Sequence, residues 1–550
     1  MGELIDQLAA EYFEELMAQE PTWAHMIGEY AHAGSYEEAS REAEDRDIAA
    51  LRRFAARAAG LPPGDPGAQD EITRQVIAAD AGSRADLKEC RLRELSASSV
   101  FGDQAQLPVI IGMLGLPTPE VAEAMVDKFH AIGRSYRQLA ERHREGVAHG
   151  RTPAQFSVAG TIEQLDALLS APLEQDPLLK TAALPEGVDA AAWRARLEKA
   201  LEDSVRPGMA AYRDALRDEV LPAARPDDRC GLHWLDGGAE VYATTLRYHT
   251  TTDLTAQEIH EIGLQKVAAL AEEYAVLGRS VLGTSDVDDV LSALRSDPAL
   301  HFTSADDIVK ASKAAFARAE AAMPNWFEVL PKAPCAVEGV TAGPSAYYFP
   351  PATDGSRGGT FFVNVTKPSA WGTFEMEALA FHEGIPGHHL QLSIAGELTG
   401  IPEFRKHVHA TAYAEGWGLY TERLADEMGL YSSDLARMGM LSTDSMRACR
   451  LVVDTGIHAL GWRREQAVDY MVANSPMSED LVRREIDRYI EYPGQATSYM
   501  IGRIELLRMR GEAMERQGEA FDIKAFHSAV LGSGGLPLDI LDGVVRAQLP

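Results

Sequence analysis

Apolar residues recur at intervals of three and four along most of the chain, which is the spacing of an amphipathic α-helix. The pattern is clearest over three segments with Gly or Pro at the breaks, namely Tyr36–Ala59, Pro119–His149 and Ala190–Ala224. At Thr255 the sequence Thr-Ala-Gln-Glu forms a capping box, so a helix is expected from there to about Leu277. The chain is therefore predicted to be mainly α-helical.

Two short segments depart from this spacing, because β-branched and aromatic residues dominate them. They are Ala346–Pro351 and Gly359–Asn364, and a polar loop, Ala352–Gly358, separates them. Two such runs joined by a short polar loop are typical of paired strands. We expect a small antiparallel β-sheet beside the helix that follows.

A stretch rich in Pro, Asp and Gly, Leu221–Gly238, interrupts the helical pattern. Composition of this kind marks domain boundaries. We therefore expect an N-terminal helical half, residues 1–225, and a catalytic half, residues 226–550. The two halves together can form one continuous two-lobed domain.

The charge balance limits the partners that the chain can bind. The 52 Lys and Arg residues against 83 Asp and Glu residues give a net charge of −31. This disfavours nucleic acid and anionic membranes, since both require basic patches. The four cysteines form no Cys-x-x-Cys pair, and the N-terminus lacks the basic start and apolar core of a signal peptide. No stretch approaches the roughly 20 apolar residues of a membrane helix. We predict a cytoplasmic protein.

The strongest chemical signal is the segment Phe381–His389, Phe-His-Glu-Gly-Ile-Pro-Gly-His-His. Two imidazoles beside a spare glutamate are typical of zinc hydrolases, in which the histidines usually stand at i and i+4. Here His388 follows His382 by six residues, which is about 240° around an ideal helix. The intervening Gly-Ile-Pro-Gly is expected to form a bulge that carries His388 to the usual position. His389 is the alternative second ligand. A kinked helix with incidental histidines would leave Glu383 unexplained.

A second acidic cluster lies in the predicted helix from about His407 to Met428. Glu415 is favoured as the third metal ligand, because Gly416 and Trp417 follow it and the small glycine would let this helix approach the first one closely. Glu422 lies on the same face but about 10.5 Å further along the axis, so the two carboxylates cannot both bind one ion directly. We expect Glu422 to contact either one of the metal-binding side chains or the amine of a substrate.

Further short motifs accompany the histidine segment along nearly the whole chain. They are Gly238-Ala239-Glu240-x-Tyr242, Leu246-Arg247, Asp354-Gly355-Ser356-Arg357, Glu415-Gly416-Trp417, Val453-Asp454-Thr455-Gly456-x-His458 and Pro493-Gly494-Gln495-Ala496. With these motifs the chain resembles the bacterial domain-of-unknown-function family DUF885. The resemblance implies a largely helical, two-lobed fold similar to that of zinc carboxypeptidases and oligopeptidases. It implies a peptidase-like activity without a named substrate.

Under this interpretation the protein is a zinc peptidase that cleaves short peptides or other small amides. Another divalent transition metal, such as manganese or cobalt, could replace zinc. Glu383 would take the proton of the attacking water and pass it to the leaving amine. Tyr499 and His458 are the candidate donors to the developing oxyanion.

Arginines are candidates for contacts with substrate. Arg503 and Arg450 could bind a substrate carboxylate through paired donors, and Arg357 lies in the loop between the predicted strands. Two other functions fit the same metal ligands: a metal-dependent amidase or esterase on a non-peptide substrate, and a catalytically silent peptide-binding protein. Glu383 argues against the silent protein, since a binding protein needs no general base.

Overall fold

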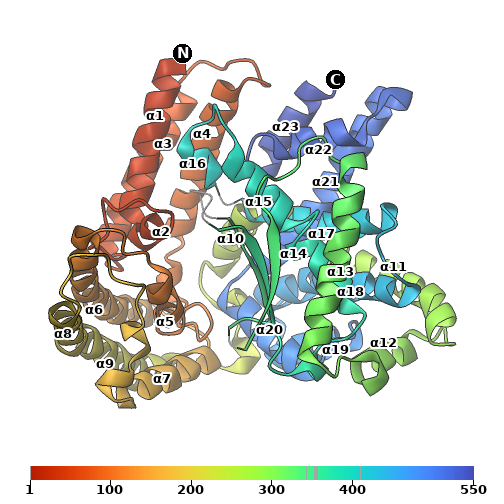
Figure 1. Cartoon of the computed structure of the whole chain (residues 1–550). Coiled ribbons are helices and arrows are strands. Elements are labelled where there is room, and N and C mark those ends of the chain that lie inside the picture. The colour runs from red at the N-terminus through yellow and green to blue at the C-terminus, as the bar shows by residue number, and fades with distance from the viewer. Residues whose placement is uncertain (1, 342, 352–356, 409) are drawn as a thin grey trace.

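The chain folds into a mainly helical structure with a small sheet (Figure 1). The computed structural model describes residues 2–341, 343–351, 357–408 and 410–550. The N-terminal helices lie on one side of the molecule and the C-terminal helices on the other. The N-terminal helices are α1 (Gly2–Gln19), α2 (Pro21–Met26), α3 (Arg41–Ala59), α4 (Gln69–Glu89), α5 (Asp103–Met113), α6 (Pro119–Ala148), α7 (Gln155–Ser170), α8 (Ala190–Ala200) and α9 (Arg206–Ala215).

The C-terminal part contains the helices that carry the predicted site. In the described part of the chain, no helix combines the length and the apolar character needed to cross a bilayer. The C-terminal helices are α10 (Gly238–Thr250), α11 (Ala256–Val281), α12 (Val287–Ser296), α13 (Ala305–Ala322), α14 (Glu375–Glu383), α15 (His388–Glu397), α16 (Glu403–Lys406), α17 (Thr411–Glu427), α18 (Asp434–His458), α19 (Arg464–Ala473), α20 (Glu479–Glu491), α21 (Ser498–Gln517), α22 (Ile523–Leu531) and α23 (Leu538–Gln548).

The helices predicted from apolar spacing form close to the predicted positions. The capping box is present, with Thr255 Oγ1 accepting from the Glu258 backbone and the Glu258 carboxylate accepting from Thr255. The first predicted helix, α3, begins at Arg41 rather than at Tyr36, because Ser40 caps it by accepting a hydrogen bond from the amide of Ala43. The segment predicted as one helix over residues 190–224 contains α8 and α9, with π-helical turns over residues 201–205 and 216–220.

The sheet contains three strands, β1 (Cys335–Val340), β2 (Ala346–Phe349) and β3 (Gly359–Asn364), in the order β1-β3-β2. The predicted antiparallel pair is β2 with β3, in which Tyr348 faces Phe361. β1 was not predicted and pairs with β3 in parallel, so the sheet is mixed. The sheet packs against α13 through the stacked rings of Phe316 and Phe361. Residues 352–356 of the predicted loop lie outside the described residues.

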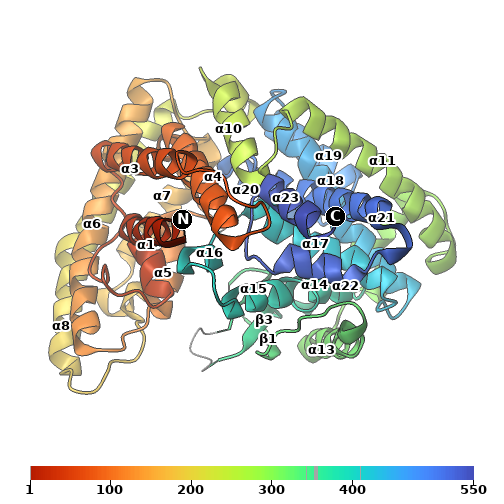
Figure 2. The same ribbon diagram turned by 90° about the horizontal axis from the view of Figure 1, so that it is seen from above.

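The hydrophobic core divides differently from the predicted boundary at residue 225. The buried residues of one core lie between Ala33 and Val220, and this core is built chiefly by α5 to α9. By contrast, α1, α3 and α4 share a core with C-terminal helices (Figure 2). For example, Tyr12 of α1 packs edge-on against Phe404 of α16, with ring centroids 5.5 Å apart. The helices up to Glu89 therefore pack with the predicted catalytic half.

Helix α17 crosses α21 at a pair of glycines. A Cβ atom on Gly502 would lie 1.9 Å from the carbonyl oxygen of Ala412, and one on Gly416 would lie 2.5 Å from Gly502. Contacts this short cannot be relieved by a side-chain rotation, because the neighbouring atoms belong to the backbone. The crossing therefore requires glycine in both helices.

Replacement of Gly502 by Ala should destabilise the protein by about 3 kcal/mol, the upper end of the usual cost of overpacking. Gly511→Ala on the same helix is the matched control, because a Cβ atom there meets nothing within 4 Å. That control should be neutral or stabilising by about 0.5 kcal/mol, since alanine restricts the unfolded chain. Thermal unfolding of both variants tests this, and equal melting temperatures would contradict the proposed crossing.

Candidate metal centre

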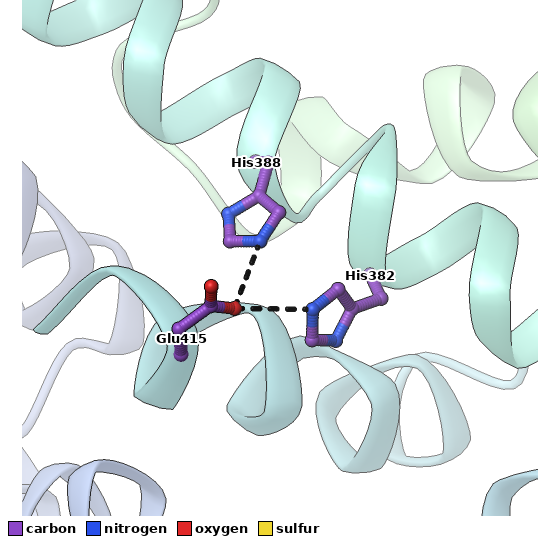
Figure 3. Close-up of side chains that lie close together, drawn as sticks. All are labelled: His382, His388 and Glu415. Carbon is purple, nitrogen blue, oxygen red and sulfur yellow. Dashed lines mark ion pairs between the residues drawn. The ribbon is translucent and has the colours of Figure 1, made fainter. Parts of the chain in front are cut away.

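Three side chains from three helices converge on one point: His382 of α14, His388 of α15 and Glu415 of α17 (Figure 3). Glu415 Oε2 lies 3.7 Å from His382 Nε2 and 3.4 Å from His388 Nε2. The available ligand atoms all lie within 4.8 Å of one another. Ligands at about 2.0–2.1 Å from a tetrahedral zinc ion are about 3.3 Å apart. The donor set and its spacing therefore fit a divalent metal ion.

The two histidines meet because the chain turns back between them. α14 ends at Glu383 and α15 begins at His388, so the break separates two helices and is not the predicted bulge within one. Gly387 lies against the end of α14, where a Cβ atom would be 1.9 Å from the carbonyl oxygen of His382. Gly384 is equally confined, since its Cβ atom would be 2.0 Å from the Phe316 ring. This glycine-enclosed turn sets the imidazole rings nearly perpendicular, with centroids 4.8 Å apart.

Helix α17 supports this turn along one face. The Trp417 indole donates to the carbonyl of Pro386 at 3.0 Å, and Thr421 Oγ1 donates to the carbonyl of Phe381 at 3.1 Å. Between them, Gly418 leaves room for the His382 ring, because a Cβ atom there would be 2.7 Å from the imidazole. Gly416 was expected to serve this purpose but faces α21. The close approach to the metal helix thus depends on Gly418.

Glu422 lies behind His382. Its Oε1 accepts from His382 Nδ1 at 2.8 Å, and its Oε2 accepts from Thr443 Oγ1. The Glu422 side chain is 0% exposed, which excludes the predicted contact with a substrate amine. Of the two roles predicted for Glu422, the structure supports the contact with a candidate metal ligand, which is His382. A carboxylate in this position fixes the tautomer of a metal-binding histidine and raises its basicity.

The two carboxylates beside His382, those of Glu415 and Glu422, stabilise a positive charge on or near its imidazole. Burial lowers the pKa of His382, but hydrogen bonds to Glu415 and Glu422 outweigh this effect and raise it to about 9. Burial raises the pKa of Glu415, but the two imidazoles lower it further, to well below its ordinary value. A proton or a metal cation between these groups supplies the balancing charge. The side chains of His388 and Glu415, 13% and 20% exposed, are the parts of the centre open to solvent.

His389 faces away from the centre and toward the sheet. Its Nδ1 accepts from the hydroxyl of Tyr348 at 2.8 Å, and its Nε2 donates to the carbonyl of Ala333 at 3.0 Å. Both ring nitrogens are therefore used in structural bonds. Of the two alternatives for the second ligand, the geometry selects His388.

Glu383 and Tyr499 lie beside the centre. Glu383 is half-buried and makes no hydrogen bond or ion pair with any residue in the described ranges. The Tyr499 ring stacks on His382 with centroids 6.4 Å apart. Burial and the charge of Glu415 raise the pKa of Tyr499, so its phenol remains a proton donor. Both residues thus occupy positions from which their predicted roles are possible.

His458, the other candidate oxyanion donor, lies in a different cluster. Its Nδ1 accepts from the amide of Leu232 at 3.1 Å, and its Nε2 donates to the carbonyl of Tyr489 at 3.0 Å. Burial lowers its pKa to about 3, so it remains neutral. The sequence suggested a donor because a polar residue interrupts an apolar helix. In the structure that residue joins backbone segments, which removes it from the candidate site.

The cluster around His458 unites three of the sequence motifs. The Tyr242 hydroxyl donates to Asp454 Oδ1 at 2.6 Å, and the Gly494 amide donates to the same oxygen at 3.1 Å. The Tyr242 ring also packs on His458, with centroids 5.1 Å apart. Burial raises the pKa of Asp454 to about 7, although both hydrogen bonds lower it. These three motifs therefore form one buried, hydrogen-bonded cluster.

Two of the predicted substrate arginines, Arg503 and Arg357, have other partners. Arg503 forms a buried ion pair with Asp444, which also accepts from Arg423 at 2.6 Å. Arg503 is thus part of the helix packing, contrary to the prediction. Arg357 is exposed, donates to the carbonyl of Pro350 at 2.6 Å and stacks on Phe349. None of these contacts joins Arg357 to the centre.

Sequence reasoning missed Thr443, Gly418 and Trp417 as supports of the centre. Thr443 and Trp417 carry no local signal of these contacts, because each depends on how two helices pack. The run Gly-Trp-Gly at Gly416–Gly418 did signal close packing, but not which glycine faces which helix.

Comparison with known proteins places the chain in a family of undefined activity. A family model described as "Bacterial protein of unknown function (DUF885)" matches residues 21–545. The crystal structure of a protein described as a putative lipoprotein from Colwellia psychrerythraea is similar, with a TM-score of 0.89 at 24% identity, covering 99% of this chain and 98% of that one. A protein from Shewanella oneidensis, described as a putative lipoprotein of unknown function, has a TM-score of 0.76 at 18% identity, covering 98% of each chain. No curated protein matches. These structures share the fold with this chain.

Substitution of Glu422 by Gln should weaken binding of zinc by about 10- to 100-fold, because the second hydrogen bond of a ligating histidine contributes that much. Glu427→Gln is the matched control: it lies on the same helix, and the Glu427 side chain is paired with Arg510 near the surface. Competition with a chromophoric chelator measures both affinities. Equal affinities in the two variants would contradict the role of Glu422.

The raised pKa of Asp454 predicts a pH dependence of stability. Between about pH 4 and pH 7 the carboxyl is ionised in the unfolded chain and protonated in the folded one. The unfolded state then binds fewer protons, so this group makes stability fall with rising pH by up to about 1.4 kcal/mol per pH unit. Asp454→Asn removes the titration. Unfolding across this range should show the wild type losing stability relative to the variant as pH rises, and a constant difference would refute the assignment.

Proposed function

The chain belongs to the DUF885 family of bacterial proteins of unknown function, and from its His382–His388–Glu415 centre we propose that it is a zinc-dependent peptidase acting on short peptides. One observation carries the proposal. Glu383, adjacent to a candidate ligand, keeps a carboxylate without a partner among the described residues next to an assembled ligand set. A structural metal site has no use for an unpaired base at this position.

The metal is assigned to zinc from the donor set of two imidazoles and one carboxylate, which is common in catalytic zinc sites. Such an ion lowers the pKa of water and polarises a carbonyl group. Manganese or cobalt would satisfy the same donors, since geometry and availability decide among these ions. His382, held by Glu422, and His388, held by the turn, would bind the ion together with Glu415.

The other residues have distinct roles in the proposed reaction. Glu383 removes a proton from the attacking water and delivers it to the leaving amine, which requires a carboxylate free of other partners. Tyr499 places a phenol on the His382 side of the centre and donates to the oxygen that gains negative charge. β2, the edge strand next to His389, offers backbone groups to an extended peptide.

Replacement of Glu383 by Gln should lower kcat by about 10²- to 10⁴-fold, the usual contribution of a general base, and leave the bound metal intact. Glu397→Gln is the control, because its carboxylate lies at the far end of α15, beside Lys332. Mass spectrometry of a digested peptide pool measures the activity, and elemental analysis measures the metal.

Two results would count against the proposal. Loss of the metal together with activity in Glu383→Gln would show that Glu383 is a ligand rather than the base. If the wild-type protein binds stoichiometric zinc but cleaves no peptide, the remaining functions are those of an amidase, an esterase or a binding protein. Turnover of non-peptide amides and esters separates these alternatives.

A further inference from the structure

Tyr499 connects the metal centre to a group of arginines. Its ring stacks on His382, and the guanidinium carbons of Arg450 and Arg447 lie 4.6 Å and 5.6 Å from the ring centroid. Arg488 joins them through Glu485, which lies 2.8 Å from Arg450 Nη2 and 3.6 Å from Arg488 Nε. We refer to Arg447, Arg450 and Arg488 as the arginine cluster.

The arginine cluster has more positive charge than its surroundings balance. Glu485 is the one carboxylate paired with it among the described residues, and Arg447 forms no ion pair there. Arg447 Nε, Arg450 Nη1 and Arg488 Nη2 are buried nitrogens that have no hydrogen-bond partner in the described structure. Arg447 is 9% exposed and Arg450 is 4% exposed.

Buried guanidinium nitrogens without a hydrogen-bond partner are costly, because they lose water without gaining an acceptor. The carboxyl of Asp454 does not supply the missing charge, since it accepts from Tyr242 and Gly494 rather than from an arginine. The excess is notable in a chain with a net charge of −31. The unpartnered nitrogens are therefore available to an anion from outside the chain.

We propose that the arginine cluster binds the C-terminal carboxylate of the substrate, so that the proposed peptidase removes residues from the C-terminal end. This inference rests on the proposed function. A peptide extends by about 3.3–3.6 Å per residue, and Tyr499 lies within 6.4 Å of one group and 4.6 Å of the other. A carboxylate on the arginine cluster thus places a peptide bond near the C-terminus at the metal centre. An internal segment of a long chain carries no such charge.

The first test compares two substrates that differ only in this group, N-acetyl-trialanine with a free carboxylate and the same peptide with a C-terminal amide. Carboxylates bind guanidinium groups through paired, charge-assisted hydrogen bonds, which an amide cannot replace. We expect kcat/KM to be at least about 100-fold higher for the acid, because the amide leaves buried donors unpaired. Equal values for the two peptides would overturn the proposal.

The second test removes one charge from the arginine cluster. Arg447→Met is chosen because Arg447 has no ion pair whose loss would disturb the fold. It should lower the ratio of kcat/KM for the acid to kcat/KM for the amide at least about tenfold, because only the acid loses a charge-assisted contact, and Arg447→Lys should restore part of this ratio. Arg483→Met is the matched control, since Arg483 pairs with Glu465 and Glu479 on the outer side of α20. An equal effect on both peptides would show a structural role and would contradict the carboxylate site.

Binding to the zinc-loaded Glu383→Gln variant separates this proposal from the proposed function. Calorimetry with the acid and the amide measures affinity without turnover. Preferential binding of the acid, lost on adding Arg447→Met, supports the carboxylate site even if the wild type cleaves neither peptide. Cleavage of both peptides with no preference in binding supports the peptidase and refutes the carboxylate site. Failure of the acid to bind also refutes it.

Discussion

The packing of α17 against the turn between α14 and α15 is the constraint on which the candidate site depends. Trp417 and Thr421 bond to backbone carbonyls on both sides of His382, while Gly418 leaves space for its ring. The same helix supplies Glu415 as a candidate ligand and Glu422 as the support of His382. On its other side it crosses α21 at Gly416. One helix thus sets the position of His382, its orientation and its charge.

Several features could be predicted because they depend on local sequence. Helical spacing located α6, a capping box located α11, and runs of β-branched and aromatic residues located β2 and β3. The types and order of His382, His388 and Glu415 indicated a shared centre, and these side chains do lie together. The glycines and the proline within the motif indicated a break between the histidines, although the break separates two helices and is not the predicted bulge.

Other features could not be predicted, because they arise from contacts between distant segments. His382 pairs with a glutamate 40 positions along the chain, and His458 with an amide 226 positions away, so sequence alone cannot tell which histidine is structural. The choice between His388 and His389 likewise depended on the sheet. β1 was missed because Cys-Ala-Val-Glu-Gly-Val has a weak strand pattern, and its pairing with β3 is parallel.

The adjacent His388 and His389 give the fold a mechanical property. One imidazole faces the candidate centre, and its neighbour is anchored to Tyr348 on the edge strand β2. Since the glycine turn, rather than a continuous helix, joins α15 to α14, the two candidate ligands do not move as one rigid rod. A displacement of the sheet would therefore change the spacing between His382 and His388, so that a ligand bound at the strand edge would affect the geometry of the candidate centre.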